Sequence, residues 1–209
     1  MLIDKAVIEY VEEAILPLYA KFDRAHSTDH VESVIERSLI LATHYNVDLT
    51  MVYAIAAYHD IGLPLGREEH HTNSARLLRE DTRLKEWFSA EQIATMAEAV
   101  EDHRASSDHE PRSIYGRIVA EADRLIDSDL VLRRTVQYGL AHYPELSREG
   151  HWERFCNHLS EKYAEGGYLR LWIPESDNAK RLARLREVIS DPALLRKSFD
   201  RIFEEESSL

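Results

Sequence analysis

An apolar segment that ends in a histidine–aspartate pair constrains the fold of this chain more than any other feature. Residues 53–62 read Tyr-Ala-Ile-Ala-Ala-Tyr-His-Asp-Ile-Gly, a helix-favouring run that ends in His59 and Asp60 and is closed by Gly62. The small alanine side chains suit a helix packed closely by neighbours on several sides. Burying an imidazole and a carboxylate at its end is unfavourable unless something binds them. Because both groups are good ligands for first-row metals, a divalent cation is the simplest explanation.

The composition predicts an all-helical protein. The chain has 209 residues, enough for one domain with a substantial core, and 44% of them are hydrophobic. Only 7 glycines and 6 prolines occur, whereas alanine, leucine, glutamate and arginine are abundant. We therefore expect an all-α fold.

Charge and hydropathy exclude several classes of partner. The net charge of −12 disfavours a grip on a nucleic-acid backbone. A small anionic substrate remains compatible with it, because a bound metal reverses the local field. The chain lacks an apolar run long enough to span a membrane, and its first residues do not resemble a secretory signal. Cys156 is the single cysteine, which fits a reducing cytoplasm. We therefore expect a cytoplasmic protein that binds neither nucleic acid nor membrane. The protein could form a homodimer.

The hydrophobic period predicts helices along the whole chain. The N-terminal segment carries Pro17, where we expect a kink or a break. Thr50 is the expected N-cap of the helix that ends at the His-Asp pair, and Ser89 and Gln92 form a capping-box pattern. We expect one domain over residues 1–209, with a metal-binding core at about 20–135 and a C-terminal helical extension at about 136–209. The predicted helices are 2–22, 28–45, 50–60, 68–80, 89–103, 114–126, 129–143, 148–165, 176–190 and 192–205.

Four residues stand out as a candidate ligand set: His30, His59, Asp60 and Asp123. Each lies near the end of a predicted helix or on a helix that follows a polar loop. They are far apart in sequence, so only a folded helical bundle can bring them together. A single histidine would be read as an ordinary core or surface residue. The order His…His-Asp…Asp in a helical chain is what makes this group a candidate site.

This pattern resembles the HD-domain superfamily of metal-dependent phosphohydrolases. The matching stretches are residues 25–31, 57–62 and 120–125, and residues 70–75 and 101–103 look like two further histidine positions of that family. The resemblance covers about residues 20–135. It implies an HD-domain helical bundle in which His30, His59, Asp60 and Asp123 bind one divalent ion.

The resemblance leaves the number of metal ions open. In some branches of the family only the four core ligands hold one ion, and in others two more histidines build a site for a second ion. His103 is a candidate ligand or a candidate substrate contact. His70 and His71 compete for the remaining position, because adjacent residues on a helix point about 100° apart and only one can face inward. The metal can be Mn, Mg, Fe, Co, Ni or Zn.

The expected chemistry is hydrolysis of a phosphoester or phosphoanhydride of a small metabolite, a nucleotide above all. A metal held by these ligands lowers the pKa of bound water and stabilises charge on a phosphoryl group. Asp60 can orient or deprotonate that water if one of its oxygens is free, and Glu121 is a weaker candidate. Five side chains could contact the substrate phosphate: Arg104, Arg112, Arg124, Arg37 and His26. For the arginines the alternative is an ordinary surface salt bridge. For His26 the alternatives are a hydrogen bond to a metal ligand or a plain loop position.

Two rival functions share the same scaffold. Di-iron oxygenases of this superfamily use six ligands and require two irons and oxygen. A non-catalytic HD module would sense a nucleotide without turnover, although intact ligands argue against it. Two hydrolase branches fit poorly. The Gly-Tyr-Pro triplet of the cyclic-dinucleotide branch does not occur here, and Ile61 and Gly62 stand where the stringent-response hydrolases carry acidic residues.

Overall fold

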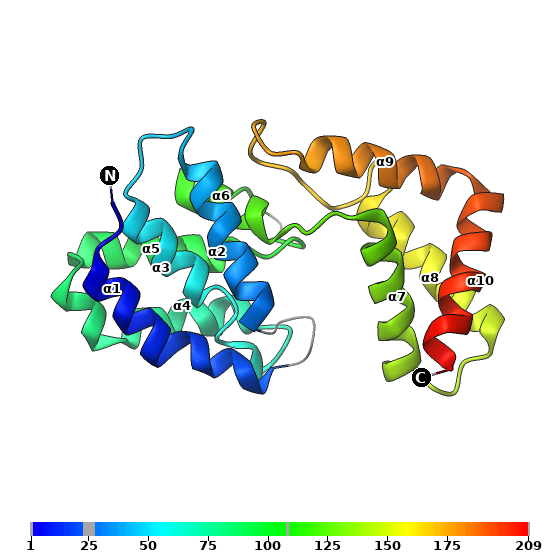
Figure 1. The fold of residues 1–209 in the computed structure, drawn as a ribbon, viewed down its shortest axis with the longest axis horizontal. Coiled ribbons are helices and arrows are strands. Elements are labelled where there is room, and N and C mark those ends of the chain that lie inside the picture. Colours follow the sequence, from blue (N-terminus) through cyan, green and yellow to red (C-terminus); the bar gives the residue numbers. More distant parts are fainter. Residues whose placement is uncertain (1, 23–27, 108, 209) are drawn as a thin grey trace. The chain divides into compact units, whose positions relative to one another are not determined.

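The computed structural model describes residues 2–22, 28–107 and 109–208, and in these ranges it contains helices and no strand (Figure 1). The all-α prediction is confirmed. The α-helices are α1 (Lys5–Tyr10), α2 (Thr28–Ala42), α3 (Leu49–Tyr58), α4 (His70–Glu80), α5 (Ala90–Glu101), α6 (Ile114–Asp123), α7 (Ser128–His142), α8 (Arg148–Tyr163), α9 (Asn178–Ser190) and α10 (Pro192–Ser207).

The helices group into two compact units, each with its own core. The N-terminal unit runs to Arg124 and also includes Trp172–Ser176, and the C-terminal unit comprises Leu125–Leu171 and Asp177–Leu209. The boundary between the two units falls directly after α6, because α7 packs with α8, α9 and α10. The expectation of one domain, with a metal-binding core at about 20–135, stays a prediction.

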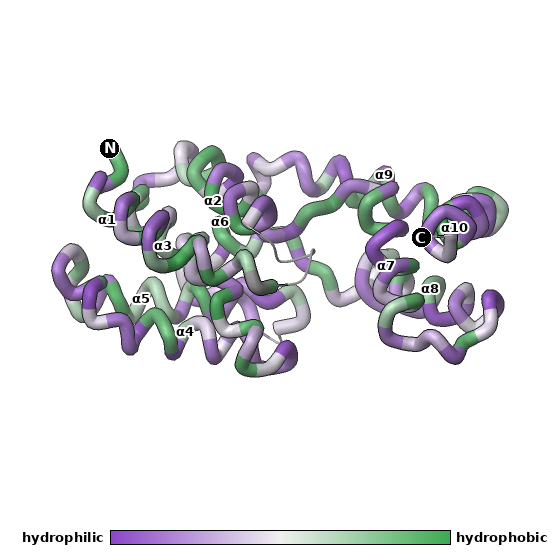
Figure 2. The backbone as a smooth tube through the Cα atoms, turned by 60° about the horizontal axis from the view of Figure 1, so that its bottom comes forward, coloured by the Kyte–Doolittle hydropathy of each residue, from purple (hydrophilic) through white to green (hydrophobic). Residues whose placement is uncertain are grey.

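Helix α3 is the centre of the N-terminal unit. Every residue from Met51 to Tyr58 is buried, and α2, α5 and α6 all pack against this helix. In Figure 2 the backbone of α3 carries the colour of hydrophobic residues over much of its length. The helix begins after Asp48, whose side chain accepts hydrogen bonds from the backbone N–H groups of Thr50 and Met51. Asp48 is therefore the N-cap, whereas the sequence had indicated Thr50, which is the second residue of the helix, two positions after the N-cap.

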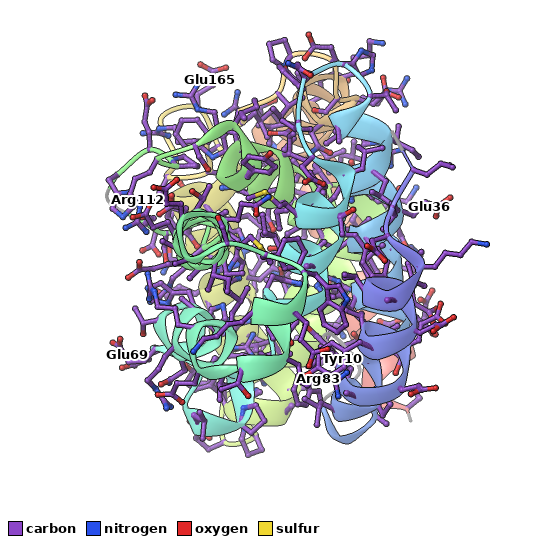
Figure 3. All side chains as sticks on the ribbon, turned by 90° about the vertical axis from the view of Figure 1, so that its left-hand side faces the viewer. Tyr10, Glu36, Glu69, Arg83, Arg112 and Glu165 are labelled. Atoms are coloured by element: carbon purple, nitrogen blue, oxygen red, sulfur yellow. The ribbon has the colours of Figure 1, made fainter. Side chains whose placement is uncertain are left out.

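The N-terminal segment changes helix type before its proline. After α1, residues Val11–Ile15 form one π-helical turn, and Leu16–Lys21, which contains Pro17, form a 3₁₀-helix. Proline has no N–H to donate, and it clashes with an α-helical turn before it, so the change of helix type is the expected break. Tyr10, the last residue of α1, lies beneath the guanidinium of Arg83 (5.4 Å to the ring centroid), and Figure 3 labels both residues side by side.

Helix ends elsewhere follow local sequence signals. The capping box at α5 is confirmed, since Ser89 Oγ accepts from Gln92 N and the Gln92 side chain accepts from Ser89 N. In the C-terminal unit Pro192 occupies the first turn of α10, after the N-cap Asp191. Phe155 of α8 and Phe199 of α10 are fully buried there. Within the described ranges, each helix is too short or too polar to cross a membrane.

Candidate metal centre

The end of α3 carries His59 and Asp60 into the interior, as the sequence predicted. His59 is the C-cap residue of α3 and is fully buried, and Asp60 is 3% exposed. Tyr19 fixes this turn, because its hydroxyl donates to Ala57 O (2.9 Å) and accepts from Asp60 N (3.2 Å). Tyr19 was not singled out from the sequence, which gives no sign that an aromatic residue of the first segment returns to this point.

Four side chains converge at this end of α3, and they are the four predicted ligands. His30 comes from the first turn of α2, and Asp123 is the last residue of α6. His30 Nε2 lies 3.3 Å from His59 Nε2 and 3.2 Å from Asp123 Oδ1, and His59 Nε2 lies 3.2 Å from Asp60 Oδ2. We call this set the first ligand group. Asp123 is its most open member, since 26% of its side chain is exposed.

A second ligand group shares Asp60 with the first. His70, the first residue of α4, and His103, which follows α5, place their Nε2 atoms 3.2 Å apart. These two nitrogens lie 3.5 Å and 3.4 Å from Asp60 Oδ1. The two oxygens of Asp60 thus face different histidine pairs, Oδ2 toward His59 and His30 and Oδ1 toward His70 and His103.

The hydrogen bonds of three histidines show that this donor set fits metal ions. The Nδ1–H groups of His59, His70 and His103 each donate to the backbone carbonyl three residues earlier, at 2.7, 2.7 and 2.6 Å. A carbonyl only accepts, so each Nε2 of the neutral imidazole carries its lone pair toward the site. The facing lone pairs of His70 and His103, 3.2 Å apart, repel unless a proton or a metal ion lies between them. Such orientation of the ring by a second hydrogen bond is typical of metal-binding histidines.

The electrostatics of the group also favour a cation. Burial lowers the pKa of His59, but the carboxylates of Asp60 and Asp123 outweigh it and raise that pKa to about 9. Burial raises the pKa of Asp60, but the imidazoles of His59 and His103 hold it well below its usual range. Burial and the neighbouring His103 lower the pKa of His70 to about 4, which keeps its nitrogen free of a proton at neutral pH. The carboxylates therefore stay ionised and attract any cation of suitable size.

Of the two adjacent histidines, His70 is the one that faces the site. His71 is partly buried beside it, with the ring centroids 5.6 Å apart, and its Nδ1 finds no hydrogen-bond partner in the described part of the chain. The sequence had left the choice between them open. The start of α4 at His70 settles it, because the first turn then presents His70 toward Asp60.

The predicted phosphate contacts have different surroundings. Arg112 is held by Asp102, with its NH2 group 2.6 Å from Asp102 Oδ1, and by Glu101 at 2.7 Å, and Figure 3 shows it at the surface of the N-terminal unit. Its charge is thus already paired. Arg104 follows His103 directly and donates to Glu68 O (2.5 Å).

Arg124 and Arg37 meet at the end of α6. Arg124 is 6% exposed and donates to Ala120 O of its own helix, and its Nε has no partner among the described residues. Arg37 donates to the Arg124 carbonyl (3.1 Å). Burial lowers the pKa of Arg124. His26 lies outside the described residues.

Glu121, the weaker candidate for handling the attacking water, binds a backbone segment. It is fully buried, and its carboxylate accepts from Trp172 N (2.6 Å) and Ser176 Oγ (2.5 Å). The sequence offered no signal for this pairing, since Trp172–Ser176 contains no motif. The role of Glu121 in catalysis stays a prediction, and its two oxygens are engaged on the side of α6 that binds this segment.

An all-helical unit with a buried histidine–aspartate cluster could hold a metal ion, and comparison with known proteins shows which domain it is similar to. Residues 28–126 match the model of the HD domain. Over these residues the chain is similar to the HD domain, in agreement with the resemblance seen in the sequence. HD domains bind divalent metal ions, and the two ligand groups described above can hold them.

Comparison with curated proteins gave no match. Among solved structures, the chain is similar to a predicted HD superfamily hydrolase from an uncultured Thermotogales bacterium, whose crystal structure was determined at 1.45 Å. The two sequences are 23% identical with a TM-score of 0.49, and the match covers 75% of this chain and 87% of that one.

Proposed function

We propose that this protein is a metal-dependent phosphohydrolase that cleaves a phosphoester or phosphoanhydride of a small metabolite, with nucleotides as the first class to test. The observation that carries the proposal is the position of Asp60, whose two oxygens face two separate histidine pairs at 3.2–3.8 Å and 3.4–3.5 Å. A carboxylate in this position can bridge two metal ions. We therefore infer a centre for two ions, with Asp60 as the shared ligand.

We infer a separate role in the centre for Asp60, for Asp123 and for the histidines. Divalent ions would lower the pKa of a bound water and stabilise the charge of a phosphoryl group. Asp60, with both oxygens turned to the histidines, holds the two ligand groups together and has no oxygen left over for the attacking water. Asp123 is the exposed ligand, so water and substrate would approach the centre on its side. The backbone-bound histidines keep their Nε2 atoms fixed throughout.

An anionic substrate must overcome the negative charge of the chain. The net charge is −12, and the buried carboxylates add to the local field. Metal ions reverse that field, and a cation next to the ligands extends the effect. Arg104 is the best candidate for a phosphate contact, because it follows His103 and its recorded hydrogen bond goes to a neutral carbonyl. Arg112 is a poorer candidate, since two carboxylates neutralise it.

The test is a release assay with metal-free protein to which Mn²⁺, Mg²⁺, Co²⁺, Ni²⁺, Zn²⁺ or Fe²⁺ is added. Phosphate and pyrophosphate are measured across nucleotides and other phosphorylated metabolites. We expect metal-dependent release by the wild type and by His109→Ala, whose side chain is half exposed and lies 3.9 Å from Asp102. We expect none from His59→Ala. Absence of release with every metal, from protein that binds two ions, would overturn the proposal.

The six ligands of the two groups also favour one rival function. A di-iron oxygenase of the same superfamily would use this set with two irons, so oxygen consumption by iron-loaded protein without phosphate release would replace the hydrolase with an oxygenase. Binding of a nucleotide without turnover would instead favour a sensing module.

A further inference from the structure

A short segment from between α8 and α9 is part of the N-terminal unit. Trp172–Ser176, which we call the strap, packs with the N-terminal unit although the residues on both sides of it belong to the C-terminal unit. Ile173 is 3% exposed within the core of the N-terminal unit, and Trp172 packs against the same core. At the surface the Tyr45 hydroxyl donates to Glu175 Oε2 (2.6 Å).

Glu121 is the residue of α6 that holds the strap. Its Oε2 accepts from the backbone N–H groups of Trp172 (2.6 Å) and Ile173 (3.4 Å), and its Oε1 accepts from Ser176 Oγ (2.5 Å). Both ends of the strap are therefore tied to one carboxylate. Because Glu121 is fully buried, losing this acceptor would leave the strap N–H groups without a partner away from water.

The hydrogen bonds between Glu121 and the strap, which we call the clasp, lie on the helical turn that carries a candidate metal ligand. α6 ends at Asp123, two residues after Glu121, and the C-cap Arg124 N donates to Glu121 O (3.2 Å). Asp123 supplies the Oδ1 that lies 3.2 Å from His30 Nε2. A helix end frays easily, since its last carbonyls have no partner within the helix. Tying Glu121 to the strap thus fixes the same turn that must hold Asp123 in place.

Only the first ligand group depends on this turn. It contains Asp123, whereas the second group consists of Asp60, His70 and His103 and has no member on α6. We propose that Glu121 is a positioning residue: through the strap it holds Asp123 and so sets the affinity of the first metal ion, without acting on the second. This inference rests on the proposed two-ion centre, and it gives Glu121 a task that needs an acceptor for the strap and does not need a base.

The test compares Glu121→Leu with Glu121→Gln in two backgrounds. His103→Ala removes a ligand of the second group and reports the first site, and Asp123→Ala removes a ligand of the first group and reports the second. Metal-free proteins are titrated with Co²⁺, and binding is followed by visible absorption of the ion. Leucine has similar size but accepts no hydrogen bond, whereas glutamine keeps an oxygen for the N–H groups and an NH₂ group that can donate to the Ser176 hydroxyl.

We expect Glu121→Leu to weaken Co²⁺ binding by about 10–100-fold in the His103→Ala background, as for other residues that orient a ligand from behind. We expect no change in the Asp123→Ala background and near wild-type affinity for Glu121→Gln in both. Ser176→Ala, which keeps the backbone donors and should fold, is expected to give a smaller loss of the same kind. Tyr45→Phe removes the surface bond to Glu175 and should leave the affinity unchanged.

Equal losses in both backgrounds, or none in either, would show that the clasp only stabilises the unit and would overturn the proposal. A glutamine variant as weak as the leucine variant would also overturn it, because the charge rather than the clasp would then matter. Failure of the wild type to bind Co²⁺ is a separate result, since it would remove the metal centre itself.

Discussion

Replacing His103 by alanine should remove one metal ion and leave the other. His103 is 2% exposed, and its Nε2 lies 3.4 Å from Asp60 Oδ1 and 3.2 Å from His70 Nε2. It takes no part in the first ligand group, which keeps all four members in the variant. The second group would be left with only Asp60 and His70. We therefore expect the metal content to fall from two ions per chain to one.

The size of the effect follows from the linkage between binding and folding. A ligand present at 100 times its dissociation constant stabilises the folded state by about 2.7 kcal/mol. For a chain of this length each kcal/mol raises the melting temperature by about 2–4 °C. Each ion should thus raise it by about 5–11 °C at that concentration. The wild type should show two such contributions and His103→Ala should show one.

The assay measures metal content by elemental analysis and the melting temperature with and without added Co²⁺. Each protein is compared with its own metal-free form, so that the packing lost with the imidazole cancels. His71→Ala is the matched control, because His71 lies beside His70 but belongs to neither ligand group. A His103→Ala protein that retained two ions and the full rise in melting temperature would refute the two-group centre.

Three further predictions concern single positions. Gly62→Ala should destabilise the N-terminal unit by about 1–3 kcal/mol and weaken metal binding by the second ligand group. The reason is that a Cβ at this position would lie 2.5 Å from the carbonyl oxygen of His70. Urea unfolding measures the loss of stability, and Co²⁺ titration measures the loss of affinity. Arg104→Ala should raise KM for the phosphorylated substrate without loss of stability, whereas Arg112→Ala should lower stability and leave KM unchanged; steady-state kinetics and melting curves separate them. Burial and nearby cations lower the pKa of His158 from 6.5 to about 4, so the C-terminal unit should lose up to about 3 kcal/mol as pH falls through that window, where the unfolded chain takes up the proton first. In His158→Gln the fall in stability between pH 6.5 and pH 4, measured by urea unfolding, should shrink, and an unchanged slope would contradict the argument.

Several helix ends, and the burial of His59 and Asp60 at the candidate site, could be predicted because their sequence signals are local. His59 and Asp60 end an apolar helix in consecutive positions, and such a pair has few partners other than a cation. The capping box of Ser89 and Gln92 is complete within four residues. The choice of N-cap at α3 was wrong by two residues, because both Asp48 and Thr50 are good caps and only the start of the helix distinguishes them.

Partners that lie far apart in the sequence could not be predicted. Glu121 binds a segment more than fifty residues away, and no sequence pattern around Glu121 or in that segment predicts the pairing. From the sequence, Arg112 is a candidate phosphate contact near the ligands. In the structure, Asp102 and Glu101 form ion pairs with it, because the loop after α5 brings Arg112 back to the end of that helix.

The arrangement of ligands on helices divides the centre into parts that respond separately. α3 is the one described element whose end contributes to both groups, through His59 to the first and Asp60 to both. α2 and α6 supply only the first group, and α4 and the residue after α5 supply only the second. If the proposed two-ion centre forms, we expect a change at the end of α3 to affect both ions and a change on α6 to affect one. Because the strap binds α6 through Glu121, the proposed positioning role predicts that residues 172–176 influence the ion bound by His30 and Asp123 and leave the other in place.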